Sequence, residues 1–72
     1  MPTFAIDIVR DGRLRPTLKA EMPSGQFAIN KARELAKSIG QPGDSVIVTH
    51  FNQLENLTFP QDVFRFSIGK KP

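Results

Sequence analysis

The stretch TFAIDIVRDGRLRPTLKAEM, residues 3–22, decides the first half of the fold. Apolar and polar residues alternate on both sides of a central Asp-Gly pair. Such alternation over two short runs joined by Asp-Gly indicates a β-hairpin with one face buried. Because the side-chain period of a strand is two, the length of the turn decides which side chains share a face.

Two registers are compatible with this hairpin. A two-residue turn would pair Arg10 with Arg13 and set Ile8 opposite Arg15, which mixes apolar and charged side chains on one face. A three-residue loop ending at Gly12 puts glycine where a left-handed residue follows a type I turn. We therefore predict the three-residue loop. Its facing pairs are Ile8–Leu14, Ile6–Pro16 and Phe4–Leu18 on the buried face, and Val9–Arg13, Asp7–Arg15 and Thr3–Lys19 on the other.

This register has two consequences. Pro16 belongs to an edge strand, where the missing N–H costs no ladder hydrogen bond. Asp7 and Arg15 become a cross-strand pair, which contributes about 0.2–1 kcal/mol.

A helix is predicted after the hairpin. Ser24 is a suitable N-cap, and Gly40 is expected to end the helix as a left-handed cap before Pro42. The apolar stripe at helical spacing consists of Ala28, Ala32, Leu35, Ala36 and Ile39. Phe27 points away from this stripe, so it either folds over the sheet edge or is free to contact a partner.

The second half is again β in pattern. Residues 45–51 contain an unbroken apolar run, as expected of a central strand. Residues 52–62 form a predicted polar loop, in which residues 57–59 are left open as a further extended segment. Residues 63–68 alternate as the last strand.

These elements predict a two-layer α+β domain of order β-β-α-β-β, with one helix on one face of a small antiparallel sheet. Pro16 at an edge and the handedness of crossovers predict the strand order second, first, third, fourth. Residues 1–69 are expected to form this single domain, and residues 70–72 a basic flexible tail.

Composition narrows the chemistry. The chain has 72 residues and no cysteine, which excludes disulfides, thiol catalysis, zinc–thiolate sites and iron–sulfur clusters. It has neither a long apolar run nor the layout of a signal peptide, so a cytoplasmic location is expected. The formal net charge of +3 favours an acidic partner.

The predicted register gathers cations on the face that the helix leaves uncovered. The expected members of this basic face are Arg10, Arg13, Arg15, Lys19 and Arg65. Cations along a strand suit phosphates or carboxylates, so nucleic acid and an acidic protein surface are both expected partners. All six aromatic residues are phenylalanines, and three of them are needed for the core, which leaves few for stacking on bases.

The N-terminus resembles the start of the 4-oxalocrotonate tautomerase family. The likeness lies in residues 1–9, MPTFAIDIV, followed by Gly12 and Arg13, and covers about a dozen residues. It implies that Pro2, with a free amine, would be the catalytic base and Arg13 a substrate-binding residue. The chain departs from the family where residues 14–22 alternate as a strand, since a long helix is expected there.

The third strand also lacks the arginine that the family places there. His50, the single histidine, has no carboxylate partner at a suitable spacing. We therefore expect no enzymatic activity, no cofactor and no metal site.

The expected function is that of a small non-enzymatic binding module acting through the basic face. The alternative is an exposed sheet edge, with residues 63–68 the more available one, that pairs with a second copy or with another protein. This compact pattern is similar to small bacterial and phage accessory proteins that bind a host enzyme.

Overall fold

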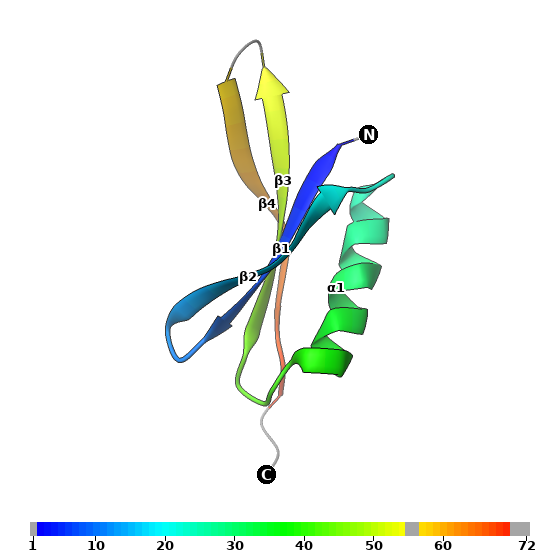
Figure 1. The fold of residues 1–72 in the computed structure, drawn as a ribbon. Helices are drawn as coiled ribbons and strands as arrows, with labels where there is room; N and C mark the ends of the chain where they lie inside the picture. Colours follow the sequence, from blue (N-terminus) through cyan, green and yellow to red (C-terminus); the bar gives the residue numbers. More distant parts are fainter. Residues whose placement is uncertain (1, 55–56, 70–72) are drawn as a thin grey trace.

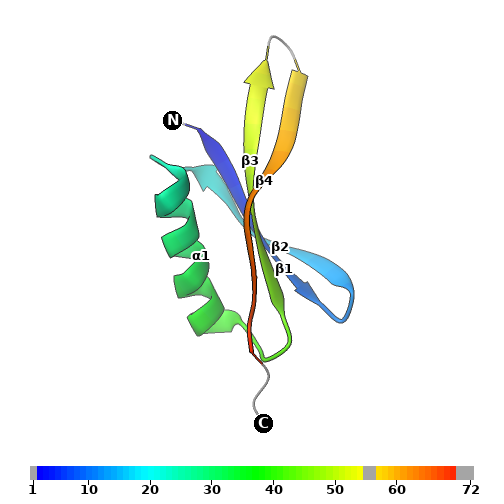
Figure 2. The same ribbon diagram turned by 180° about the vertical axis from the view of Figure 1, so that it is seen from behind.

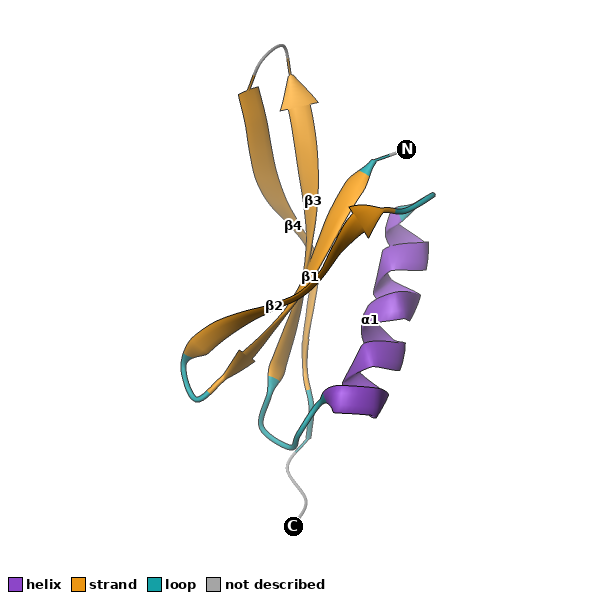
Figure 3. Ribbon diagram, in the orientation of Figure 1, coloured by secondary structure: helices purple, strands orange, loops and turns teal. Residues whose placement is uncertain are grey.

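The computed structural model describes residues 2–54 and 57–69. Four antiparallel strands form one sheet in the order β2-β1-β3-β4, and a single helix covers one of its faces (Figure 1, Figure 3). This confirms the predicted two-layer α+β fold and its strand order. The predicted tail, residues 70–72, lies outside the described residues. The elements are β1 (Thr3–Arg10), β2 (Arg13–Glu21), α1 (Gly25–Ile39), β3 (Ser45–Leu54) and β4 (Leu57–Ser67).

The core lies between α1 and the sheet. Ile6, Val46 and Val48 are its largest fully buried side chains, and they face Ala28 and Ala32 of the helix. Because alanine is small, α1 lies close to β1 and β3, and short aliphatic side chains fill the layer between them.

The central strand β3 is buried on both faces. Val46 and Val48 face the helix, whereas Ile47 and Thr49 are buried on the opposite face, where the described residues provide no second layer. The unbroken apolar run of the sequence reflects this two-sided burial.

The predicted hairpin register is wrong. Arg10 pairs directly with Arg13, and the turn has only two residues, Asp11 and Gly12. Both have positive φ, 54° and 75°, which is the pattern of a type I′ turn and matches the twist of the flanking strands. The positive φ predicted for Gly12 is confirmed, although it occurs in a different turn.

A β-bulge removes the conflict that argued against the two-residue turn. The register shifts between Ile6 and Asp7, so Thr17 of β2 has no partner on β1. Beyond the bulge Leu18 pairs with Ile6, so the apolar side chains in the rest of β2 face the core. Before it, Pro16 pairs with Asp7, so the predicted Asp7–Arg15 and Ile6–Pro16 pairs are also wrong.

The helix begins as predicted and ends for a different reason. Ser24 is the N-cap and its Oγ accepts a hydrogen bond from the Phe27 N–H at 3.2 Å. Gly40 has φ −72°, so it is not the expected left-handed cap. A Cβ atom at Gly40 would overlap the Ile68 side chain and the Ala36 carbonyl oxygen, so close packing requires the glycine.

The predicted loop 52–62 is largely strand. β3 continues to Leu54 and β4 begins at Leu57, and the two strands pair along this whole length. Their paired ends project beyond α1 as one arm, and the β1–β2 hairpin projects at the other end of the sheet as a second (Figure 1, Figure 2). We refer to residues 8–17 as the β1–β2 arm.

Candidate functional site

The observed register divides the predicted basic face between two sides of the sheet. Arg13 and Arg15 pair with Arg10 and Ile8, so they lie on the side of the sheet that carries α1. Lys19 pairs with Ala5 and lies on the opposite side. The expectation of one shared basic face is therefore wrong, because the turn is one residue shorter than predicted.

Arg13 and Arg15 are exposed on the β1–β2 arm, on the side of the sheet that carries α1. None of the ion pairs among the described residues involves either side chain. Leu14, between them, is 55% exposed. The arm therefore offers two guanidinium groups on its α1 side and the apolar Leu14 side chain on its other side.

Arg10 is a structural residue. Its Nη2 lies 2.8 Å from Oδ2 of Asp44, whose side chain is only 3% exposed, and also donates to the Ile39 carbonyl oxygen at 3.3 Å. The hydrogen bond from Arg10 and the N–H of Gln41 hold the pKa of the Asp44 carboxyl below its ordinary value. Asp44 and its partner Arg10 are 34 positions apart in the sequence. No local sequence pattern indicates such a pair.

The cations on the other side of the sheet are engaged locally. The Lys19 amino group lies 4.5 Å from the centre of the Phe51 ring, a cation–π contact. Arg65 Nη2 lies 3.6 Å from Asp62 Oδ2, and both side chains are well exposed. Neither contact is indicated by a local sequence pattern.

Phe27 is half-exposed on the outer surface of α1, beside Asn30, Lys31 and Glu34. It does not fold over the sheet edge. Of the two predicted placements, over the sheet edge or free to contact a partner, the structure has the second. Phe27 lies in the N-terminal half of α1, whereas Arg15 lines a groove with Ile39 at the C-terminal end of the helix.

A groove of ≈520 Å³ lies where the β1–β2 arm passes the C-terminal end of α1. Its cationic residues are Arg10 and Arg15. Its apolar residues are Ile8, Leu14, Pro16 and Ile39. This combination of apolar walls and a guanidinium with no ion-pair partner among the described residues is the most distinctive binding feature that the predicted residues form.

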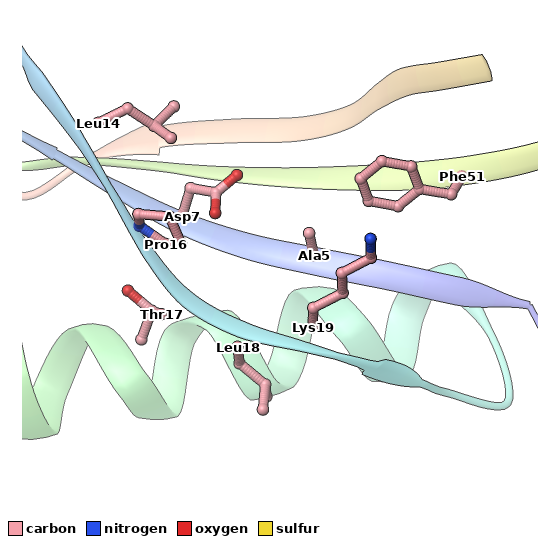
Figure 4. A pocket seen from close by; sticks show the side chains of 8 residues that line it. All are labelled: Ala5, Asp7, Leu14, Pro16, Thr17, Leu18, Lys19 and Phe51. Atoms are coloured by element: carbon pink, nitrogen blue, oxygen red, sulfur yellow. The ribbon is translucent and has the colours of Figure 1, made fainter. Parts of the chain in front are cut away.

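A second groove, of ≈370 Å³, lies across the sheet face that α1 leaves uncovered (Figure 4). Ala5 and Asp7 lie at its centre, Leu14 and Pro16 along one side, and Phe51 at one end. Burial in these surroundings raises the pKa of Asp7.

The residues considered for catalysis lie far apart. Pro2 is at the end of the sheet where its carbonyl oxygen accepts from the Met22 N–H at 2.9 Å. Arg13 is at the opposite end of the hairpin, about 25 Å away at the rise of a β-strand. His50 stacks on Phe4 with 4.8 Å between ring centres.

Within residues 2–54 and 57–69, no three side chains of His, Asp or Glu are grouped so that they could hold a metal ion. None of the helical structure described here has the length and apolar character of a membrane span. Comparisons of the chain with protein-family models, curated proteins and solved structures found no match.

Proposed function

We propose that this protein is a non-enzymatic binding module whose β1–β2 arm recognises an acidic surface on a protein partner. The observation that carries the proposal is the sequence Arg13-Leu14-Arg15 on an exposed arm, with both guanidinium groups outside the ion pairs of the described residues. Arginine is suited to this role because its planar fork binds carboxylates through two hydrogen bonds.

The groove beside the arm favours protein over nucleic acid. Ile8, Leu14 and Ile39 give it apolar walls, and Arg15 supplies a charge at its rim. Protein interfaces combine arginine with apolar anchors in this way. Single-stranded nucleic acid would use aromatic side chains for stacking, yet the exposed Phe27 and Phe59 are not among the residues of this groove.

The test is selection from a random-peptide display library on the immobilised protein. We expect enrichment of peptides in which Asp or Glu flanks a large apolar residue. Synthetic versions should bind at least tenfold more weakly to Arg15→Glu, as measured by fluorescence anisotropy. Arg33→Glu is the matched control, because it makes the same charge change on the exposed surface of α1. No enrichment of acidic peptides, or equal binding to Arg15→Glu, would refute the proposal.

Nucleic acid is the competing partner, and a salt titration distinguishes it. Phosphate contacts release counterions, so each contact adds about −0.9 to the slope of log affinity against log salt on duplex DNA. If Arg13→Ala and Arg15→Ala each flattened that slope while acidic peptides failed to bind, the arm would be a phosphate-binding surface.

A further inference from the structure

The sheet has a second face, opposite α1, which we call the open face. Residues that pair directly across strands share a face, and the observed register places six residues that concern us on this one. They are Ala5, Asp7, Leu14, Pro16, Ile47 and Phe51. Figure 4 shows Ala5, Asp7, Leu14 and Phe51 on the side of the sheet away from the helix, whereas Leu18 points toward it.

The open face is apolar at its centre. Ala5 and Ile47 are 6% and 9% exposed although α1 lies on the opposite face, and Leu14 on the same face is 55% exposed. A sheet face of this composition is normally packed against another layer. Within the described residues the only helix, α1, lies on the opposite face (Figure 3).

The chain exposes more surface than a compact monomer of its mass. A compact monomer of 8.0 kDa exposes about 4,450 Å², whereas this chain exposes 5172 Å². The excess of about 700 Å² belongs to the whole chain, including its two projecting hairpins, and a standard interface takes roughly 800 Å² from each partner. The Cα radius of gyration, 12.6 Å, also exceeds the value of about 11 Å for a compact domain of this length.

Asp7 and Lys19 are two opposite charges on the open face. Asp7 has no ion pair or side-chain hydrogen bond among the described residues, and its apolar surroundings disfavour the charged form. Lys19 lies on the same face with its amino group over Phe51. In a two-fold interface every contact between two different residues occurs twice, once in each direction. An ion pair between Asp7 of one copy and Lys19 of the other is therefore formed twice.

Neither edge strand of the sheet is well suited to pair with a strand of a second copy. β2 carries Pro16 and the bulged Thr17, and β4 carries Pro60 and the bulged Val63. A proline and a bulge on an edge strand interrupt the hydrogen-bonding groups that a new strand would need. A second copy therefore has more continuous surface available on the open face than at either edge.

We propose that the open face packs against the open face of a second copy of this chain, forming a two-fold dimer with the helices outside. Asp7 of each copy then faces Lys19 of the other, and Leu14 packs across the interface. Arg13 and Arg15 lie on the α1 side of the sheet and stay available in the dimer, whereas Leu14 and Pro16, which line both grooves, belong to both surfaces.

Sedimentation equilibrium measures this association directly. We expect the wild-type protein to reach twice its chain mass of 8.0 kDa with increasing concentration. Leu14→Glu should weaken association at least tenfold, because it places a charge within the interface. Leu57→Glu is the matched control: Leu57 is 61% exposed but lies on β4 opposite Leu54, away from the six residues named on the open face. A monomer at all concentrations, or a dimer lost with Leu57→Glu and kept with Leu14→Glu, would overturn the proposal.

A charge swap tests the pairing and separates this proposal from the peptide-binding one. Asp7→Lys and Lys19→Asp should each weaken the dimer, and the double variant should recover it, since the complementary pair is restored with opposite signs. Both residues lie outside the groove of Arg15, so peptide binding should persist in all three variants. Circular dichroism confirms that each variant is folded. Additive losses in the double variant would refute the Asp7–Lys19 contact.

Discussion

Arg10 and Asp44 join the end of β1 to the segment between α1 and β3. Nε of Arg10 donates to Oδ1 at 3.1 Å and Nη2 to Oδ2 at 2.8 Å, a two-point ion pair. The Asp44 carbonyl oxygen accepts from the Ile68 N–H at 2.8 Å, and its carboxylate accepts from the Gln41 N–H at 2.9 Å. One aspartate therefore fixes the relative positions of β1, the helix end and the end of β4.

The two partners of this pair should not be equally sensitive to mutation. Arg10→Ala leaves a carboxylate that is 3% exposed without its cation, whereas Asp44→Asn leaves a guanidinium that can reach water. We expect Arg10→Ala to lower Tm by about 5 °C or more for a domain of this size, and by more than Asp44→Asn does. Arg13→Ala, on the exposed arm, is the control and should change Tm little. Thermal denaturation followed by circular dichroism measures this, and a larger loss in Asp44→Asn would contradict it.

The same pair predicts how stability depends on pH. The folded-state pKa of Asp44 is lowered, first by the hydrogen bond from Arg10, so its contribution is fully present above the unfolded value near 3.8. That contribution is lost as pH falls through the lowered pKa. Arg10, Arg15 and the Gln41 N–H are the groups that act on this carboxyl.

Denaturation between pH 2 and pH 7 tests this. The wild-type chain should lose more stability on acidification than Asp44→Asn, which has no proton to take up at this position. Parallel acid profiles for the two proteins would show that Asp44 is not held in its ionised form.

The pKa of Asp7 is shifted in the opposite direction from that of Asp44. Burial raises its pKa, so at pH 7 the charged carboxylate opposes folding of the monomer. Asp7→Asn should therefore raise the Tm of the monomer at pH 7, measured at a concentration below the dimerisation range. The same variant should weaken self-association, because it removes one member of the Asp7–Lys19 match. A variant that stabilised both the monomer and the dimer would contradict the assignment of Asp7 to the interface.

The two glycines Gly40 and Gly12 should respond differently to alanine. At Gly40 the backbone is ordinary, but a Cβ would overlap Ile68 and the Ala36 carbonyl, so the substitution should cost about 1–3 kcal/mol from overpacking. At Gly12 nothing lies within 4 Å, and the cost arises only from its φ of 75°. Ile68→Ala should partly restore Gly40→Ala, by relieving the overlap, and should not help Gly12→Ala. Urea denaturation measures the stability of the two glycine variants, each with and without Ile68→Ala. If Ile68→Ala fails to restore Gly40→Ala, the clash is with the Ala36 carbonyl alone.

Catalysis by Pro2 is not expected. With Pro2 and Arg13 at opposite ends of one hairpin, a small keto acid cannot contact both in the same chain. A form with a free Pro2 amine should enolise simple keto acids no faster than its Pro2→Ala counterpart, as followed by ultraviolet absorbance. A rate well above the solution rate that is lost in Pro2→Ala would establish the enzyme.

Much of the architecture could be predicted because it depends on local patterns. Alternation defined β1 and β2, Ser24 and the alanine-rich stripe defined α1, and Pro16 placed β2 at an edge. These signals act over a few residues, through the period of the side chains and the capping of free N–H groups, so each can be recognised from sequence alone. The strand order followed from them by the rules of chain connection.

The candidate sites depended on features that only the tertiary structure decides. Sequence indicated a turn at Asp11-Gly12 but not its length, because the bulge that makes the shorter turn acceptable, at Thr17, lies outside the turn itself. That single residue sends Arg13 and Arg15 to one side of the sheet and Lys19 to the other. The partner of Arg10 likewise could not be predicted, since Asp44 is brought to it only when α1 returns the chain to the sheet. Residue spacing thus determined the elements, whereas long-range packing decided which charges are paired and which are free to bind.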